Sequence, residues 1–140
     1  MQVTPSGRFI GRFDYNTDLL ASITELCKKE NIRLGTFTVI GAVTSAKMGY
    51  YDQTAQKYVY CVSLEKKLEI TSCVGNISLK GSEIFVHAHI TLADWEGHCY
   101  GGHLMPGTNV FAAEYYIHEL QGGELIREFD PETGLNLWPK

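Results

Sequence analysis

The chain has 140 residues, of which 44% are hydrophobic and 20% are charged, and its formal net charge is −4. This is the composition and length of one globular domain that folds without disulfides. No apolar run approaches the roughly 18 residues that a membrane-spanning helix needs. The first residues, MQVTPSGR, lack the apolar core of a secretory signal. We therefore expect a single domain, residues 1–140, that stays in the cytoplasm without membrane contact.

The four cysteines, at positions 27, 61, 73 and 99, are too far apart to form a C-x-x-C pair. We expect them to be reduced and mostly buried, as small apolar residues. Cys99 is the expected exception, because it lies among histidines.

The first elements predicted are a strand and a helix. A strand is expected over residues 8–15, and Gly11 within it indicates a bulge or a close backbone approach. Thr17 offers an N-cap oxygen for a helix over residues 18–30. The apolar residues of that helix recur at helical spacing: Leu19, Leu20, Ile23, Leu26 and Cys27.

Strand-forming residues dominate the rest of the chain. Strands are expected over residues 36–43, 46–51, 57–64, 68–79, 83–93 and 110–120. Turns at residues 52–56 and 80–82 indicate two hairpins. We expect residues 124–129 to pair with 110–120 as a third hairpin, followed by a turn at 130–134. One early helix followed by many strands predicts an α+β fold with a mainly antiparallel sheet.

Histidine placement is the most informative feature for function. In residues 86–90, VHAHI, side chains alternate across a strand, so His87 and His89 share one face and their apolar neighbours share the other. Two imidazoles roughly 6–7 Å apart on one strand face can converge on a metal ion. His103, which follows two glycines, can supply a third imidazole. Three neutral imidazoles plus a water form the ligand set of open zinc sites.

The spacing alone leaves alternatives open. A same-face histidine pair is also common as a half-exposed surface pair, and imidazole binds nickel or copper as well as zinc. His98 competes as the third ligand, and Cys99 is a weaker candidate. Asp94 and Glu96 could orient a ligand by accepting its second N–H, or they could be solvated loop charges. His118 has no partner nearby in sequence and is expected to be structural.

At these histidines the sequence resembles a known family. The runs FVHAHITLADWEG, from Phe85 to Gly97, and YGGHL, from Tyr100 to Leu104, resemble the signature of the PPC domain (plants and prokaryotes conserved) in its stand-alone prokaryotic form. Further stretches agree with it: Arg12–Asp14, Gly41–Val43, Gly49–Asp52, Gly75–Ile77 and Asp130–Gly134. The resemblance covers nearly the whole chain. It implies an α+β fold, a homotrimer, and a divalent metal, zinc by expectation, at His87, His89 and His103.

The family also carries a DNA-binding label. In the plant relatives, A·T-rich DNA is bound by R-G-R-P arms that lie outside the PPC domain, and this chain contains no such arm. The acidic net charge points the same way, because phosphate neutralisation supplies most non-specific affinity for DNA. We therefore expect weak binding of DNA, without sequence preference.

Three functions remain as hypotheses. The first is a metal-binding enzyme that acts on a small molecule, in which Asp94, Tyr100 and Glu114 are possible proton-transfer partners. The second is a DNA-associated or regulatory protein, as the label suggests. The third is a trimeric assembly module with a structural metal, closed by apolar residues: Tyr115, Tyr116, Leu135, Leu137 and Trp138. We rank a trimeric, metal-binding protein first, with no reaction assigned.

Overall fold

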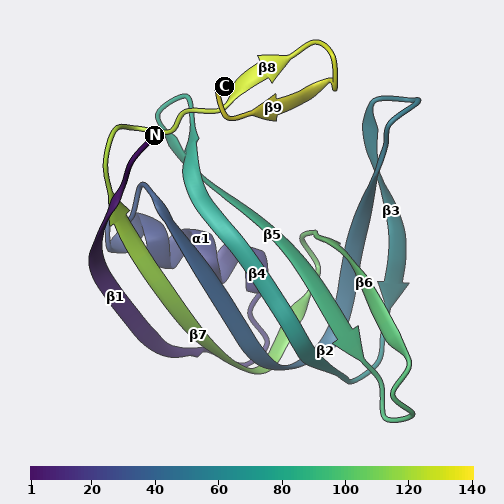
Figure 1. Ribbon diagram of the computed structural model, residues 1–140. Helices are drawn as coiled ribbons and strands as arrows, with labels where there is room; N and C mark the ends of the chain where they lie inside the picture. Colours follow the sequence, from purple (N-terminus) through teal and green to yellow (C-terminus); the bar gives the residue numbers. More distant parts are fainter.

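The protein contains one helix and nine strands, in a computed structural model that describes residues 1–140 (Figure 1). The helix is α1 (Leu19–Lys29). The strands are β1 (Thr4–Phe13), β2 (Gly35–Asp52), β3 (Lys57–Leu64), β4 (Leu68–Lys80), β5 (Glu83–Ala93), β6 (Cys99–Leu104), β7 (Asn109–Gln121), β8 (Glu128–Asp130) and β9 (Leu135–Leu137). This order confirms the predicted α+β class.

Seven strands form one antiparallel sheet in the order β1-β7-β2-β4-β5-β6, with β3 paired to β2. The last strand, β6, also pairs with β2, through Met48–Leu104 and Gly49–His103. Strands β2, β4, β5 and β6 therefore form a closed ring. The predicted hairpin of β4 and β5 is confirmed, with eleven residue pairs from Glu69–Ala93 to Lys80–Glu83.

Strand β2 makes this ring possible because it changes partners along its length. Its first part, Gly35–Val43, pairs with β4 and β7, and its last part pairs with β3 and β6. The pairing shifts register around Gly41, where φ is +133°. The sequence predicted two strands, over 36–43 and 46–51. The structure has a single strand with irregular pairing between the two parts.

The hydrophobic core lies between the sheet and α1, which covers one face of the sheet (Figure 1). Leu19, Ile23 and Cys27 form the buried stripe of the helix. On β5 the buried side chains alternate with outward ones, and the buried set is Val86, Ala88, Ile90 and Leu92. The helix is too short and too polar to cross a membrane.

The N-cap of the helix lies one residue later than predicted. Asp18, not Thr17, is the N-cap, and its carboxylate accepts a hydrogen bond from the backbone N–H of Ala21 at 2.8 Å. The Thr17 hydroxyl donates instead to the carbonyl oxygen of Asp14. An aspartate at the N-cap also places negative charge beside the positive end of the helix dipole.

Residues 124–129 are not the hairpin partner of 110–120, so that prediction was wrong. Strand β7 already has β1 on one edge and β2 on the other, and no edge remains for a third strand. The chain instead crosses to Leu79, which forms an isolated bridge with Ile126, and β8 then pairs with β9. This C-terminal hairpin lies apart from the main sheet (Figure 1).

The glycine pair before His103 concealed strand β6, which the sequence did not predict. Glycine is depleted in strands, and two in succession favour a turn. Here the missing side chain is required, because a Cβ on Gly102 would lie 2.9 Å from the carbonyl oxygen of Gly49 on β2. Tertiary contact between β6 and β2 therefore decides the conformation.

We predict that Gly41→Ala lowers the free energy of unfolding by about 3 kcal/mol. The added Cβ would lie 2.1 Å from the Ala112 carbonyl oxygen, at a φ that L-residues rarely adopt. Gly81→Ala is the matched control, because Gly81 also has positive φ but has no atom within 4 Å of the added Cβ. It should cost about 1 kcal/mol. Urea denaturation at equal protein concentration measures the free energy of unfolding of both variants. An equal decrease in the two would show that the backbone of β2 shifts at Gly41 to make room for the added Cβ.

Candidate metal centre

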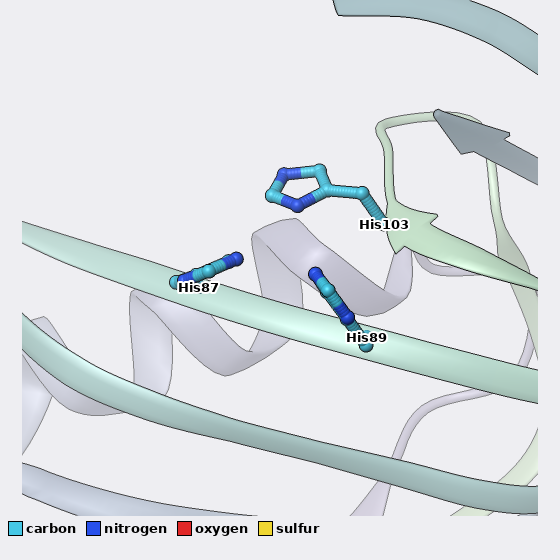
Figure 2. A group of neighbouring side chains, drawn as sticks. All are labelled: His87, His89 and His103. Carbon is cyan, nitrogen blue, oxygen red and sulfur yellow. The ribbon is translucent and has the colours of Figure 1, made fainter. Parts of the chain in front are cut away.

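Three histidines from two neighbouring strands meet on the outer side of β5. His87 and His89 point away from the core because their neighbours on β5 are buried. His103 on β6 lies directly opposite His89 in the strand register. One nitrogen from each ring lies within 4.8 Å of the other two. Figure 2 shows a nitrogen of each ring turned toward the space that the three rings share.

The packing of the rings leaves one nitrogen without a partner. The ring centroids of His87, His89 and His103 are 4.9–5.6 Å apart. The Nδ1 atom of His103 is buried and has no hydrogen-bond partner. In Figure 2 this atom, next to the stem of the side chain, faces the other two rings. Buried polar atoms nearly always have a partner, so this nitrogen is placed as a ligand would require.

The surroundings keep His87 and His103 neutral. Burial, followed by the positive charges possible at His103, Arg127 and His89, lowers the pKa of His87 to about 4. Burial, followed by His89 and Arg127, also lowers the pKa of His103. Only the neutral imidazole can donate a lone pair to a metal ion. No carboxylate belongs to the group, and its three imidazoles fit the ligand set of an open zinc site.

Asp94 lies at the far end of β5 and organises the loop there. Its carboxylate accepts hydrogen bonds from the Lys66 amine, the Tyr100 hydroxyl and the backbone N–H groups of Glu96 and His98. Asp94 is buried, whereas His98 is exposed. Asp94, Glu96 and His98 also lie close enough to hold an ion, but the hydrogen bonds of Asp94 already account for that arrangement.

None of the four residues expected near the metal forms a hydrogen bond with the three histidines. Asp94, Glu96 and Tyr100 belong to the loop just described. Glu114 lies on β7, three strands from β5 in the sheet order. Cys99, the weaker alternative for the third ligand, is exposed beside Gly97, and His118 is exposed on β7. Cys61 is exposed as well, so only Cys27 and Cys73 are buried as expected.

Two neighbours of the site were not found from the sequence. The ring of Tyr58, on β3, lies 4.6 Å from the ring of His103. Arg127, which is only 9% exposed, lies near enough that its charge lowers the pKa of both His87 and His103. Both belong to distant parts of the sequence, and neither stands in a motif that would have marked it.

Comparison with known proteins assigns the chain to a family. The sequence profile of the Plants and Prokaryotes Conserved (PCC) domain, also written PPC, matches residues 2–121. This chain belongs to the PPC family. The match confirms the resemblance seen in the sequence. Residues 122–140, which carry the C-terminal hairpin and Arg127, lie beyond the matched region.

Solved structures of PPC relatives share the fold over nearly the entire chain. A metal-containing protein from Archaeoglobus fulgidus is 40% identical, with a TM-score of 0.93 over 99% of this chain and 97% of that one. A plant- and prokaryote-conserved (PPC) protein from Pyrococcus horikoshii is 34% identical, with a TM-score of 0.93 over 99% of this chain and 95% of that one.

A curated relative places a similar sequence within a longer protein. The Bifunctional protein GlmU of Synechococcus sp. (strain JA-2-3B'a(2-13)) is 29% identical over 119 residues, which is 84% of this PPC chain. The aligned region covers 17% of that relative, so the chain spans about a sixth of its length.

We predict that the charge of Asp94 stabilises the protein fully above about pH 4 and progressively less as the pH falls below that value. Its hydrogen bonds, led by that from Lys66, hold the pKa of Asp94 well below its usual range. For a depressed pKa, the stabilisation is full above the unfolded-state value, about 3.9, and is lost as the pH falls further. Urea denaturation should therefore show Asp94→Asn less stable than wild type from pH 5 to 8, with the difference shrinking below pH 4. Glu96→Gln, which keeps its backbone N–H bond, should show no such difference.

Proposed function

We propose that this PPC chain is a cytoplasmic, homotrimeric protein that binds one divalent metal ion, zinc, through His87, His89 and His103. The main support is the Nδ1 atom of His103, which is buried and has no hydrogen-bond partner. Ring nitrogens of His87, His89 and His103 also lie within 4.8 Å of one another. The relative from Archaeoglobus fulgidus, described as metal-containing, supports the proposal. The four cysteines, all free, suit a reducing compartment.

The residues of the site also suggest what it does. Three imidazoles leave a tetrahedral ion with one open position, and an ion held in this way can polarise a small molecule bound there. The chain itself would hold His87 and His103 neutral through burial and the nearby Arg127. It would also shield one side of the site with the ring of Tyr58. We therefore propose metal-assisted binding of a small molecule.

The outer face of the sheet supports the proposal of a trimer. A row of residues runs across five strands in register: Ile10, Tyr116, Thr38, Val74 and His89. Ile10 is 73% exposed and Val74 is 51% exposed, and Ile40 is also exposed on β2. Exposed apolar surfaces of this kind commonly mark protein contacts. The tail residues Leu135 and Leu137, by contrast, line a cavity within their own chain.

DNA binding has less support. The net charge of −4 remains unfavourable, and the row just described contains no lysine or arginine.

We predict that His87→Ala, His89→Ala and His103→Ala each reduce bound zinc by at least tenfold after dialysis against a weak chelator. Removing one of three imidazoles leaves a pair, which holds zinc far more weakly. His98→Ala and His118→Ala serve as controls and should retain zinc, because both side chains are exposed away from the triad. Elemental analysis gives the zinc content. Full zinc in the His103 variant would exclude the proposed ligand set.

We predict a mass of three times 15.7 kDa in light scattering at micromolar concentration. Val74→Lys should shift the protein toward monomers, because each of the three contacts would then bury a lysine that has no counter-ion. Trp95→Lys is the control, since Trp95 is 90% exposed in the β5–β6 loop and lies outside the row. A monomeric wild type, or equal dissociation of both variants, would contradict the proposed interface.

A further inference from the structure

A cavity of about 480 Å³ opens beside the three histidines. It exists because β6 pairs with β5 only from His89 to Ala93 and then leaves to join β2. The first half of β5, including His87, therefore has a free edge. The start of β3, the C-terminal hairpin and Met105 surround that edge, and His87 and His103 both line the cavity. A ligand in this space would touch the candidate metal centre directly.

All charged residues that line the cavity are basic. They are Lys57, Lys80 and Arg127, and no aspartate or glutamate is among the 18 lining residues. None of the three basic residues forms an ion pair within the chain. A divalent ion on three neutral imidazoles would add two further positive charges at the same place. The cavity therefore concentrates positive charge without any acidic group to balance it.

Arg127 is the least solvated of these charges. Its side chain contacts two aromatic rings, with the guanidinium carbon 4.9 Å from the centroid of the Phe85 ring and 5.3 Å from that of the Trp138 ring. Each of its nitrogens donates to a neutral oxygen: Nε to Ser78 Oγ, Nη1 to the carbonyl of Asn136, and Nη2 to Asn76 Oδ1.

These bonds do not satisfy the guanidinium. It has five N–H donors, so each terminal nitrogen keeps one that the chain does not use. Burial also lowers the pKa of Arg127, which is the sign of a charge that lacks solvent and counter-ion. A buried charge of this kind is costly unless an opposite charge compensates it.

We propose that the cavity binds a small organic oxyanion, a carboxylate or a phosphate ester, whose acidic group lies between Arg127 and the three-histidine centre. The guanidinium fork matches both kinds of oxyanion. This inference rests on the proposed function for the role of the metal, but the contribution of Arg127 belongs to the chain alone.

The remaining walls define the rest of the ligand. Half of the lining residues are hydrophobic, and they include Tyr58, Phe85, Leu135 and Leu137. The volume lies within the range of pockets that enclose small organic molecules. A ligand with an apolar or aromatic body and one acidic group therefore fits better than a bare inorganic anion.

A purely structural role is the competing explanation for Arg127, because its bonds also tie the C-terminal hairpin to β4. The two explanations differ in what they predict for the lysines. A structural clamp needs no positive charge at Lys57 or Lys80, which are exposed at the rim. An oxyanion site is weakened when those charges are removed.

Titration calorimetry with phenyl phosphate, benzoate and benzyl alcohol tests the proposal on the full chain, both zinc-loaded and chelator-treated. Benzyl alcohol carries the ring without the charge. Trp138 gives a second readout, because it is one of two tryptophans and stacks on Arg127. In a Trp95→Phe background, which removes the exposed second tryptophan, its fluorescence reports on the surroundings of Arg127.

We expect at least one of the two anions to bind, more tightly with zinc present, and benzyl alcohol to bind at least tenfold more weakly. The anion that binds identifies the acidic group. Arg127→Met should weaken binding about 30-fold. Lys57→Gln with Lys80→Gln should weaken it about threefold, with the difference vanishing at high salt. Lys29→Gln with Lys67→Gln, outside the cavity, should leave it unchanged.

Circular dichroism shows whether Arg127→Met has folded. If it has not, Arg127→Lys and the double variant Lys57→Gln with Lys80→Gln test the oxyanion site instead. Normal zinc binding without binding of either anion would overturn the oxyanion site and leave the metal proposal intact. If the chain holds no zinc but still binds an anion in a way that depends on Arg127, the metal proposal is overturned and the oxyanion site stands. Equal binding by wild type, the Arg127 variants and the lysine pair would overturn the site whatever the zinc content.

Discussion

The departure of β6 from β5 is the constraint on which the rest of the structure depends. Up to His103, β6 extends the sheet beside β5, and at that residue it also begins to pair with β2. This closes the ring of β2, β4, β5 and β6. It also holds His103 opposite His89, and it leaves the edge of β5 at His87 unpaired. The imidazole cluster and the adjoining cavity therefore have a single topological origin.

The electrostatics of the region follow from what surrounds that edge. Imidazoles that are partly buried near Arg127 gain protons less readily than free histidines, so they remain neutral at physiological pH. The same burial leaves Arg127 without a carboxylate partner. A cation in the centre would meet no negative charge from the lining of the cavity. The chain thus favours lone-pair donation to an ion while leaving the balance of charge to a further ligand.

The sequence predicted those parts of the molecule that depend on local pattern. Alternation in residues 86–90 placed His87 and His89 on one face, and the helical spacing from Leu19 to Cys27 identified the only helix. The sequence-based prediction failed where contacts between residues far apart in the chain determine the conformation. Strand β6 was not predicted because it contains two glycines, which the local pattern assigns to a turn. Gly102 is required there because β2 passes close to it, and that contact is not visible in the sequence. Residues 124–129 had no free edge to pair with, since β1 occupies the outer side of β7.

The cavity illustrates the same limit, and it also bears on how the centre is reached. Tyr58 and Arg127 come from segments far apart in the sequence, and only the folded chain brings their side chains to the histidines. The exposed row on the sheet ends at His89, so a neighbouring copy packed there would cover the histidines from that side. The cavity lies at the other end of the cluster, beyond His87, and does not include any residue of the row. Assembly through the sheet and ligand entry through the cavity are therefore compatible, because they use different sides of one cluster.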